Sequence, residues 1–133
     1  DEDTEAYNAI LDAYGLPRKS DEEKAARAAA VEAATLQASL VPLTVMKEAF
    51  EVFDLLMEMT EKGNPNSVTD GAVGVLAVRA CIRGAFLNVK INVKGLTDRA
   101  KAEELISEAQ VIDNAASKLE EEIIARVSSQ LAI

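Results

Sequence analysis

Residues 71–95 read GAVGVLAVRACIRGAFLNVKINVKG, and whether they form a helix or strands decides the fold class of the chain. The portion 71–88 is almost entirely small or apolar, is dotted with Ala and Gly, and lacks the punctuation that usually bounds strands. The tail VKINVK alternates apolar and polar residues, which favours a strand. Because 71–88 is the longer part and shows no strand boundary, we predict a helix.

Two helical segments are predicted near the start of the sequence. The first runs to about Tyr14 and ends at YGLP, where Gly15 follows the last turn and Pro17 stops it. The second begins at Ser20, which forms a capping box with Glu23, and continues to about Leu40. The apolar residues that we expect on one face of the first helix are Tyr7, Ile10, Leu11 and Tyr14.

Further helices are predicted on either side of the stretch 71–95. Pro42 should end or kink the helix that precedes it, and a third segment then runs to Gly63. The last helix should start near Thr97 or Asp98 and continue close to the end of the chain. Its apolar positions form a seam at steps of three and four: Leu105, Ala109, Ile112, Ala116, Leu119, Ile123 and Val127. These patterns predict an all-α bundle of long helices, and the length of the seams favours a homodimer.

The size of the chain bounds its organisation. Its 133 residues suffice for one domain with a core, so we assign 1–133 to a single helical domain. The sequence opens DEDTEAYNAI, already in helical rhythm, with no Met and no N-cap before it. We therefore expect the domain to be incomplete at its N-terminus.

Composition excludes several classes of function. The net charge is −9, which argues against a nucleic-acid surface. The chain has no His and one Cys, so a zinc site and an internal disulfide are not expected. We find no signal peptide and no uncharged apolar run that could cross a bilayer, and we expect a cytoplasmic protein. Acid–base chemistry must fall to Asp, Glu, Lys, Tyr or the single Cys.

Asp3 is the first candidate for such chemistry. It lies at the head of the stripe formed by Tyr7, Ile10 and Tyr14. An acid at the head of an apolar stripe should be partly desolvated, and desolvation raises the pKa of a carboxyl group towards the range useful for proton transfer. The alternative is that Asp3 is simply hydrated near a frayed helix end.

The polar stretch GNPNSVTD, residues 63–70, is the second candidate. Ser67 is predicted as an N-cap with Asp70 at the third helical position. Ordinary capping by Asn64, Asn66, Ser67 and Asp70 explains these residues, since such side chains are preferred caps. The functional alternative is a helix N-terminus whose free amides face a ligand. Spacing alone does not decide between these interpretations.

The stretch 71–95 carries two further patterns. Its only charged side chains, Arg79, Arg83, Lys90 and Lys94, share one helical stripe, which is either a solvated face or a track for a polyanionic tail. On another face Asn88 and Asn92 follow Ala77, Cys81 and Ala85. Buried amides must find partners, so these Asn side chains could bind a neighbouring backbone, a second copy of the chain, or a ligand with amide-like edges such as a pterin. Cys81 is expected to be a small core residue.

Several of these segments together resemble the cyclodeaminase family. They are DEDTEAYNAILDAYGLPRKSDEEKAAR, VPLTV, GNPNSVTDGAVGVLAVRACIRGAFLNVKINVKGLTD and the closing helix, so the resemblance covers essentially the whole chain. The family comprises the formimidoyltetrahydrofolate cyclodeaminase domain and stand-alone methenyltetrahydrofolate cyclohydrolase-like proteins. Family members carry an earlier Pro-Gly-Gly-Gly-Ser turn that this sequence lacks.

The resemblance implies a dimeric all-α enzyme that acts on a folate. The first reaction it implies is cyclisation of 5-formimidoyltetrahydrofolate to 5,10-methenyltetrahydrofolate with release of ammonia. The alternative is water addition to the methenyl compound, giving 10-formyltetrahydrofolate. A non-catalytic helical dimerisation module is the interpretation from another class.

Residue roles also follow from the resemblance. Asp3, with Ala6 and Tyr7, matches the family motif D-x-D-x-x-A-F/Y and is expected to be catalytic. We expect no metal and no cofactor beyond the tetrahydrofolate substrate, and no nucleic-acid or membrane partner. The residues expected to bind substrate, with Arg79 and Lys90 holding its glutamate tail, are Asn64, Ser67, Asp70, Asn88, Asn92, Arg79 and Lys90.

Overall fold

The computed structural model describes residues 1–132, which form four α-helices and two short 3₁₀ turns with no strand among them. The elements are α1 (Glu2–Tyr14), α2 (Asp21–Lys62), η1 (Pro65–Ser67), α3 (Val68–Asn92), η2 (Val93–Gly95) and α4 (Arg99–Gln130). The helix predicted for the stretch 71–95 is confirmed, and its alternating tail ends in the turn η2. The all-α bundle is confirmed as well.

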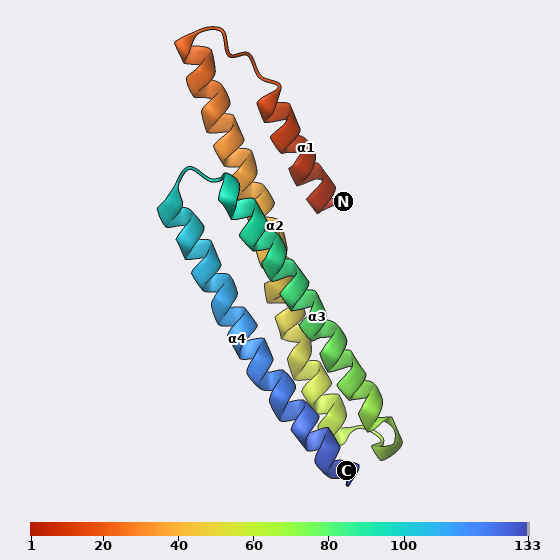
Figure 1. Cartoon of the computed structure of the whole chain (residues 1–133). Coiled ribbons are helices and arrows are strands. Elements are labelled where there is room, and N and C mark those ends of the chain that lie inside the picture. Colours follow the sequence, from red (N-terminus) through yellow and green to blue (C-terminus); the bar gives the residue numbers. More distant parts are fainter. Residues whose placement is uncertain (133) are drawn as a thin grey trace.

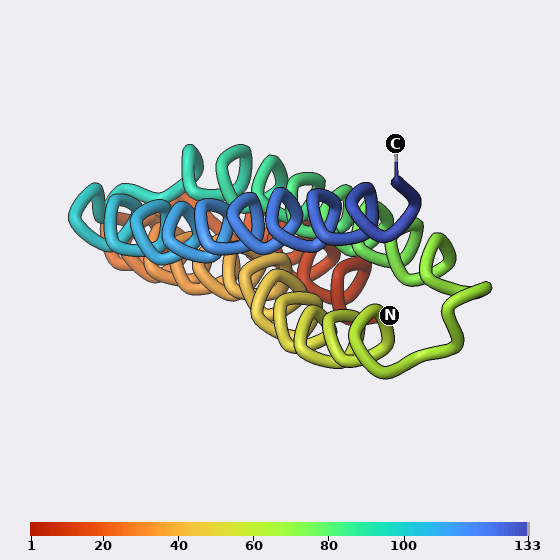
Figure 2. The backbone as a smooth tube through the Cα atoms, turned by 90° about the horizontal axis from the view of Figure 1, so that it is seen from below, coloured from red at the N-terminus to blue at the C-terminus, as the bar shows by residue number. Residues whose placement is uncertain are grey.

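Helix α2 unites two segments that we predicted separately. Pro42 lies inside it, and the helix continues without interruption for 42 residues. Figure 2 shows the path of α2 changing direction between its orange first half and its yellow second half. Proline removes one amide donor and crowds the preceding turn, which bends a helix without ending it when packing holds both sides. Pro42, Leu43 and Met46 are all buried, so packing does hold this turn.

The helices are arranged along the length of α2. Figure 1 shows α1 beside the first half of α2 only, while α3 and α4 run alongside much of the remainder. Helix α2 packs on α1, α3 and α4, so it occupies the centre of the bundle. Since α1 covers only the first half of α2, its N-terminus lies near the middle of the molecule, beside α2 and α3.

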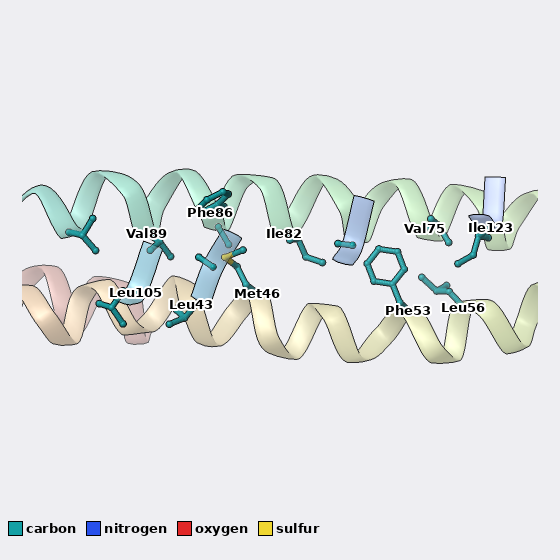
Figure 3. Close-up of a cluster of buried hydrophobic side chains, with 14 of the residues drawn as sticks. Leu43, Met46, Phe53, Leu56, Val75, Ile82, Phe86, Val89, Leu105 and Ile123 are labelled. Atoms are coloured by element: carbon teal, nitrogen blue, oxygen red, sulfur yellow. The ribbon is translucent and has the colours of Figure 1, made fainter. Parts of the chain in front are cut away.

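The core fills the space between α2, α3 and α4. Figure 3 shows its side chains meeting between the ribbons. The largest fully buried residues are Phe53, Leu43, Met46, Ile82, Leu105, Ile123, Val75 and Val89. The predicted seam of α4 is confirmed, because five of its positions are buried: Leu105, Ala109, Ala116, Ile123 and Val127.

The apolar face predicted for α1 is not the face that packs on α2. Ala6 and Ala13 are the buried residues of this helix, whereas Tyr7 is 59% exposed and Tyr14 is 53% exposed. Small side chains let α1 approach the Ala-rich first half of α2 closely, and the larger residues then point away from the contact. Cys81, which we expected in the core, is also exposed.

One side of α3 is apolar and uncovered in this chain. We call it the outer face of α3; it comprises Val73, Leu76, Ala80, Gly84, Leu87 and Ile91, none of which is buried. By length and composition alone, α2 and the segment Pro65–Gly95 are apolar enough to cross a membrane, and a third of each apolar stretch is buried in the chain. Core helices of soluble proteins meet the same criterion, so it does not assign a location.

Candidate functional site

A cavity of about 220 Å³ lies where α1, α2 and α3 meet. We call it the Asp3 cavity; it is lined by Asp3, Tyr7, Ile10, Ala38, Asn88 and Asn92. It brings together three residues that the sequence singled out, namely Asp3, Asn88 and Asn92. Two of the residues on the apolar stripe predicted for the first helix, Tyr7 and Ile10, line it rather than the core.

Asp3 enters the cavity from the first turn of α1. Asp1 is the N-cap of this helix, and its Oδ1 accepts a hydrogen bond of 3.2 Å from the backbone amide of Asp3. The Asp3 side chain is exposed, so the burial expected at the head of an apolar stripe is not seen. A second cavity, of about 230 Å³, begins at the same carboxylate and continues past Pro42, Cys81 and Asn88. Asp3 therefore stands between two adjoining hollows, accessible to a ligand in either.

Asn88 and Asn92 lie one turn apart on α3 and face α1 and α2. The Nδ2 of Asn92 donates a hydrogen bond of 2.8 Å to the backbone carbonyl of Ala38, in the middle of α2. Asn88 is exposed and borders both cavities. One amide is thus fixed by the backbone, as one of our alternatives predicted, and the other is free to turn.

Ala38 and Pro42 were missed by the sequence analysis as residues of this site. Ala38 lines the Asp3 cavity and Pro42 lines the hollow beside it. Nothing distinguishes Ala38 from the other alanines of this Ala-rich region. Pro42 was noticed only as an end or a kink of the helix, although a proline at that place also leaves one carbonyl without a donor.

The polar stretch 63–70 lies at the other end of α3. Asn64 lines a separate cavity of about 300 Å³ with Pro65, Val68 and the end of α4. Its Oδ1 accepts a hydrogen bond of 3.0 Å from the amide of Asn66, so it caps the turn η1. Ser67 takes the predicted N-cap position of α3, but its side chain makes no capping bond.

Asp70 lies in the first turn of α3 with this loop. At 1.5 Å per residue, Asn88 lies about 27 Å further along the helix. Within one chain, the loop residues Asn64, Ser67 and Asp70 are therefore not brought to the Asp3 cavity.

Arg79 requires a correction. It was predicted on a stripe of cations that could hold a ligand tail, but only 7% of its side chain is exposed. Its Nη1 lies 2.6 Å from Asp113 Oδ1. Its Nε lies 3.2 Å from Glu120 Oε2, close enough for an ion pair although the two groups are not aligned for a hydrogen bond. Arg79 is thus paired with two carboxylates of α4, because a guanidinium buried between helices must be neutralised by nearby carboxylates.

Lys90 also lies away from the Asp3 cavity. It lines a different hollow, between α3 and α4, with Arg83 and Phe86, and its Nζ lies 3.8 Å from the centre of the Phe86 ring. At about 100° per residue, Lys90 is about 200° round the helix from Asn88. A ligand in the Asp3 cavity would have to pass around α3 to reach it.

The carboxylates of the described chain do not form an obvious metal site. Among residues 1–132, no three side chains of His, Cys, Asp or Glu gather closely enough to hold a metal ion. The expectation that the chain needs no metal stays a prediction. The chemistry available at the Asp3 cavity is that of one accessible carboxylate, two carboxamides and a phenol.

Comparisons with known proteins match these observations to a family. The sequence profile of the family described as formiminotransferase-cyclodeaminase matches residues 1–111. The chain is 45% identical over 130 residues to a methenyltetrahydrofolate cyclohydrolase from Methylorubrum extorquens, an alignment that covers 98% of this chain and 62% of that protein. It is 35% identical over 98 residues to the formimidoyltransferase-cyclodeaminase of Mus musculus, covering 74% of this chain and 18% of the mouse protein.

A third relative extends the comparison. The formimidoyltransferase-cyclodeaminase of Dictyostelium discoideum is 32% identical over 119 residues, covering 89% of this chain and 21% of that protein. The chain therefore spans less than two thirds of the length of the relatives it matches, and about a fifth of the two formimidoyltransferase-cyclodeaminases. The matched region includes Asp3, Asn88 and Asn92.

Proposed function

This chain belongs to the formiminotransferase-cyclodeaminase family, and we propose that it acts on a tetrahydrofolate as a methenyltetrahydrofolate cyclohydrolase, with Asp3 as the catalytic residue. The observation that carries the proposal is the meeting of Asp3 with Asn88 and Asn92 at one cavity. The relative with 45% identity over nearly the whole chain bears the name of this activity. That relationship favours water addition over the ammonia-releasing cyclisation that we placed first on the sequence alone.

The reaction needs one group that moves a proton twice. The substrate carries a cationic carbon between N5 and N10, and water adds to that carbon. A carboxylate at Asp3 would accept a proton from the attacking water and return it to N5 as the bond between N5 and the carbon breaks. The product is 10-formyltetrahydrofolate, and one proton is released overall. Before the attack, the negative charge of Asp3 would also stabilise the cationic substrate.

The other residues of the cavity suit a reduced pterin. Tyr7 offers an aromatic face and Ile10 an apolar one, while the carboxamides of Asn88 and Asn92 match the amide-like edge of the ring. Asp3 is exposed on α1, so a substrate can approach its carboxylate without a rearrangement of the core.

Cyclodeamination is the second candidate, supported by the names of the mouse and Dictyostelium relatives. In that reaction N10 attacks the formimidoyl carbon of 5-formimidoyltetrahydrofolate. The carboxyl group of Asp3 would take the proton from N10 and deliver it to the departing nitrogen, which leaves as ammonia. The two reactions share the reacting one-carbon unit, the nitrogens N5 and N10, and Asp3 as the proton carrier, so one site could support either.

The test follows methenyltetrahydrofolate by its absorbance. The chain is given methenyl-, 10-formyl- and 5-formimidoyltetrahydrofolate in separate reactions, and ammonia is measured in the last. We expect interconversion of the first two, and we expect Asp3→Asn to lower kcat by at least about 100-fold, the usual contribution of a positioned acid–base group. Asp12→Asn, the same change on an exposed residue of α1, should leave kcat unchanged.

The substrate pattern separates the candidates. Release of ammonia without any hydration of the methenyl compound would replace the first candidate by the second. If no folate binds or reacts, the chain is a helical scaffold. If folates react equally well in wild type and Asp3→Asn, the site is elsewhere.

A further inference from the structure

Pro42 leaves one backbone carbonyl of α2 without its helical partner. In an α-helix the amide of each residue donates to the carbonyl four positions earlier, and proline has no amide hydrogen. The carbonyl affected here is that of Ala38. Ala38 is a buried residue, and it lines the Asp3 cavity. A buried carbonyl without a donor is costly, so a partner has to come from another element.

Asn92 of α3 supplies that partner. Its Nδ2 lies 2.8 Å from the Ala38 oxygen, 54 residues away in the sequence. Only the nitrogen of a carboxamide can donate to a carbonyl, so this bond fixes which end of the side chain faces α2. The Oδ1 of Asn92 accepts no hydrogen bond from the described residues, and Asn92 itself lines the cavity.

We propose that Pro42 sets the orientation of the Asn92 carboxamide, so that Asn92 presents its oxygen to the Asp3 cavity as a fixed acceptor. This inference rests on the proposed function, in that the group accepted is an N–H of the 2-amino group on the pterin edge. Asn92 is then a substrate-binding residue, and Pro42 is a positioning residue that acts through it. Asn88 makes no such bond to the described residues, so it is free to serve as donor or acceptor.

The alternative orientation shows why this matters for specificity. With an ordinary residue at position 42, its amide would satisfy the Ala38 carbonyl, and Asn92 could rotate by half a turn about its last bond. It would then present two donors as readily as one acceptor. A site with a fixed acceptor discriminates against ligands that lack the matching donor, since they leave a polar group unpaired.

The first experiment measures the bond itself and needs no folate. Thermal unfolding is compared for wild type, Pro42→Ala, Asn92→Ala and the double variant. We expect Asn92→Ala to lower the midpoint by about 3–6 °C in the wild-type background, because it leaves the Ala38 carbonyl unpaired. In the Pro42→Ala background, where a backbone amide takes over, the loss should fall to less than half of that value. Equal losses in both backgrounds would overturn the coupling of Pro42 to Asn92.

The second experiment measures the orientation through KM. Pro42→Ala should raise KM for the folate substrate by about threefold to tenfold, with kcat changed by less than twofold, because the acceptor is freed while Asp3 is untouched. Val45→Ala is the matched control, since Val45 lines the hollow beside Asp3 one turn further along α2 without making a polar contact. It should leave KM within twofold of wild type. An equal rise in KM for Val45→Ala would show that cavity shape, and not the amide, is responsible.

A substrate analogue identifies the recognised group. A tetrahydrofolate lacking the 2-amino group should bind wild type more weakly by about threefold to tenfold, and should bind wild type and Pro42→Ala equally. If the analogue retains the difference between the two proteins, Asn92 does not accept from this edge and the proposal fails. If wild type shows no turnover, Kd for tetrahydrofolate replaces KM, and the unfolding cycle still reports whether the bond exists. A failed proposed function is thereby distinguished from a failed orientation.

Discussion

At the scale of single residues, Glu32 joins two distant parts of the chain. Its carboxylate lies on α2 and accepts hydrogen bonds of 2.8 Å and 3.0 Å from the backbone amides of Thr97 and Asp98, just before α4. The Thr97 hydroxyl donates to the same carboxylate at 2.9 Å. The amide of Thr97, followed by that of Asp98, holds the pKa of the Glu32 carboxyl below its usual range.

A dependence of stability on pH follows from this contact. A carboxyl group whose pKa is lower in the folded state binds fewer protons there than in the unfolded chain. Its contribution is therefore present at neutral pH and is lost as the pH falls through the lowered pKa. We expect Glu32→Gln to reduce the free energy of unfolding at pH 7, and this reduction should shrink as the solution is acidified. Urea denaturation across the acid range measures it.

Glu103→Gln provides the comparison, because Glu103 is an exposed residue of α4. Its effect should be small and should lack the same trend with pH. A penalty for Glu32→Gln that stays constant into strong acid would show that the bonds do not depend on the charge.

At the scale of elements, the glycines of α3 divide into two kinds. A Cβ on Gly74 would lie 2.8 Å from Leu56 Cδ2, and a Cβ on Gly71 would lie 2.6 Å from Thr60 Cγ2. These glycines let α3 approach the end of α2 closely. A Cβ on Gly84 would meet nothing within 4 Å.

The two kinds predict opposite effects of the same substitution. Gly74→Ala should destabilise the protein by about 1–3 kcal/mol, because the added methyl group forces α3 away from α2. In the isolated chain, Gly84→Ala should be stabilising by up to about 1 kcal/mol, because alanine loses less backbone entropy in a helix. Chemical denaturation of both variants gives the comparison. A stabilising Gly74→Ala would mean that Leu56 yields without cost.

An element could be predicted where the residues that define it lie close together in the sequence. The start of α2 is set by Ser20 and Glu23, three residues apart, and the capping box that they were predicted to form is present. The bond between Asn92 and Ala38 spans 54 residues, and that between Arg79 and Asp113 spans 34. Periodicity placed these side chains on a helix but could not say what faced them.

The candidate site shows the same division. Motif resemblance marked Asp3, and helical spacing paired Asn88 with Asn92, so the polar part of the cavity was predicted. The packing of α1 was not predicted, because the apolar stripe of Tyr7 and its neighbours does not indicate what it faces. Alanines at Ala6 and Ala13 make the closer contact instead, and short side chains carry little hydrophobic signal.

At the scale of the whole molecule, the outer face of α3 leads us to retain the homodimer as a proposal. An exposed apolar surface of this kind usually marks an interface. Ala80 and Gly84 lie at its middle, where small residues allow two helices to approach closely. The larger residues stand on either side, and the face is free of charge. We propose that a second copy of the chain covers it.

Substitution of one exposed residue tests this proposal. Leu87 is 64% exposed, so Leu87→Glu should leave the folded chain intact while placing a charge in the interface. We expect sedimentation to show a dimer for wild type and a monomer for Leu87→Glu. At concentrations low enough for wild type to dissociate, the two proteins should have the same thermal midpoint. Val111→Glu changes a residue of α4 that is 68% exposed, and it should remain dimeric. A wild-type chain that sediments as a monomer at high concentration rules the dimer out.

The buried cluster around Arg79 has a consequence for the alignment of the bundle. Ala109, Ala116 and Ile123 repeat every seven residues along α4, so a displacement of this helix by two turns would present a nearly equivalent apolar surface to α3. Asp113 and Glu120 share the same interval, and Arg79 lies between them. A shift of α4 in either direction would remove one carboxylate from the guanidinium and add nothing charged in its place. The apolar seam thus supplies attraction with little preference for position along the helix axis. The three charged groups select a single register of α4 against α3.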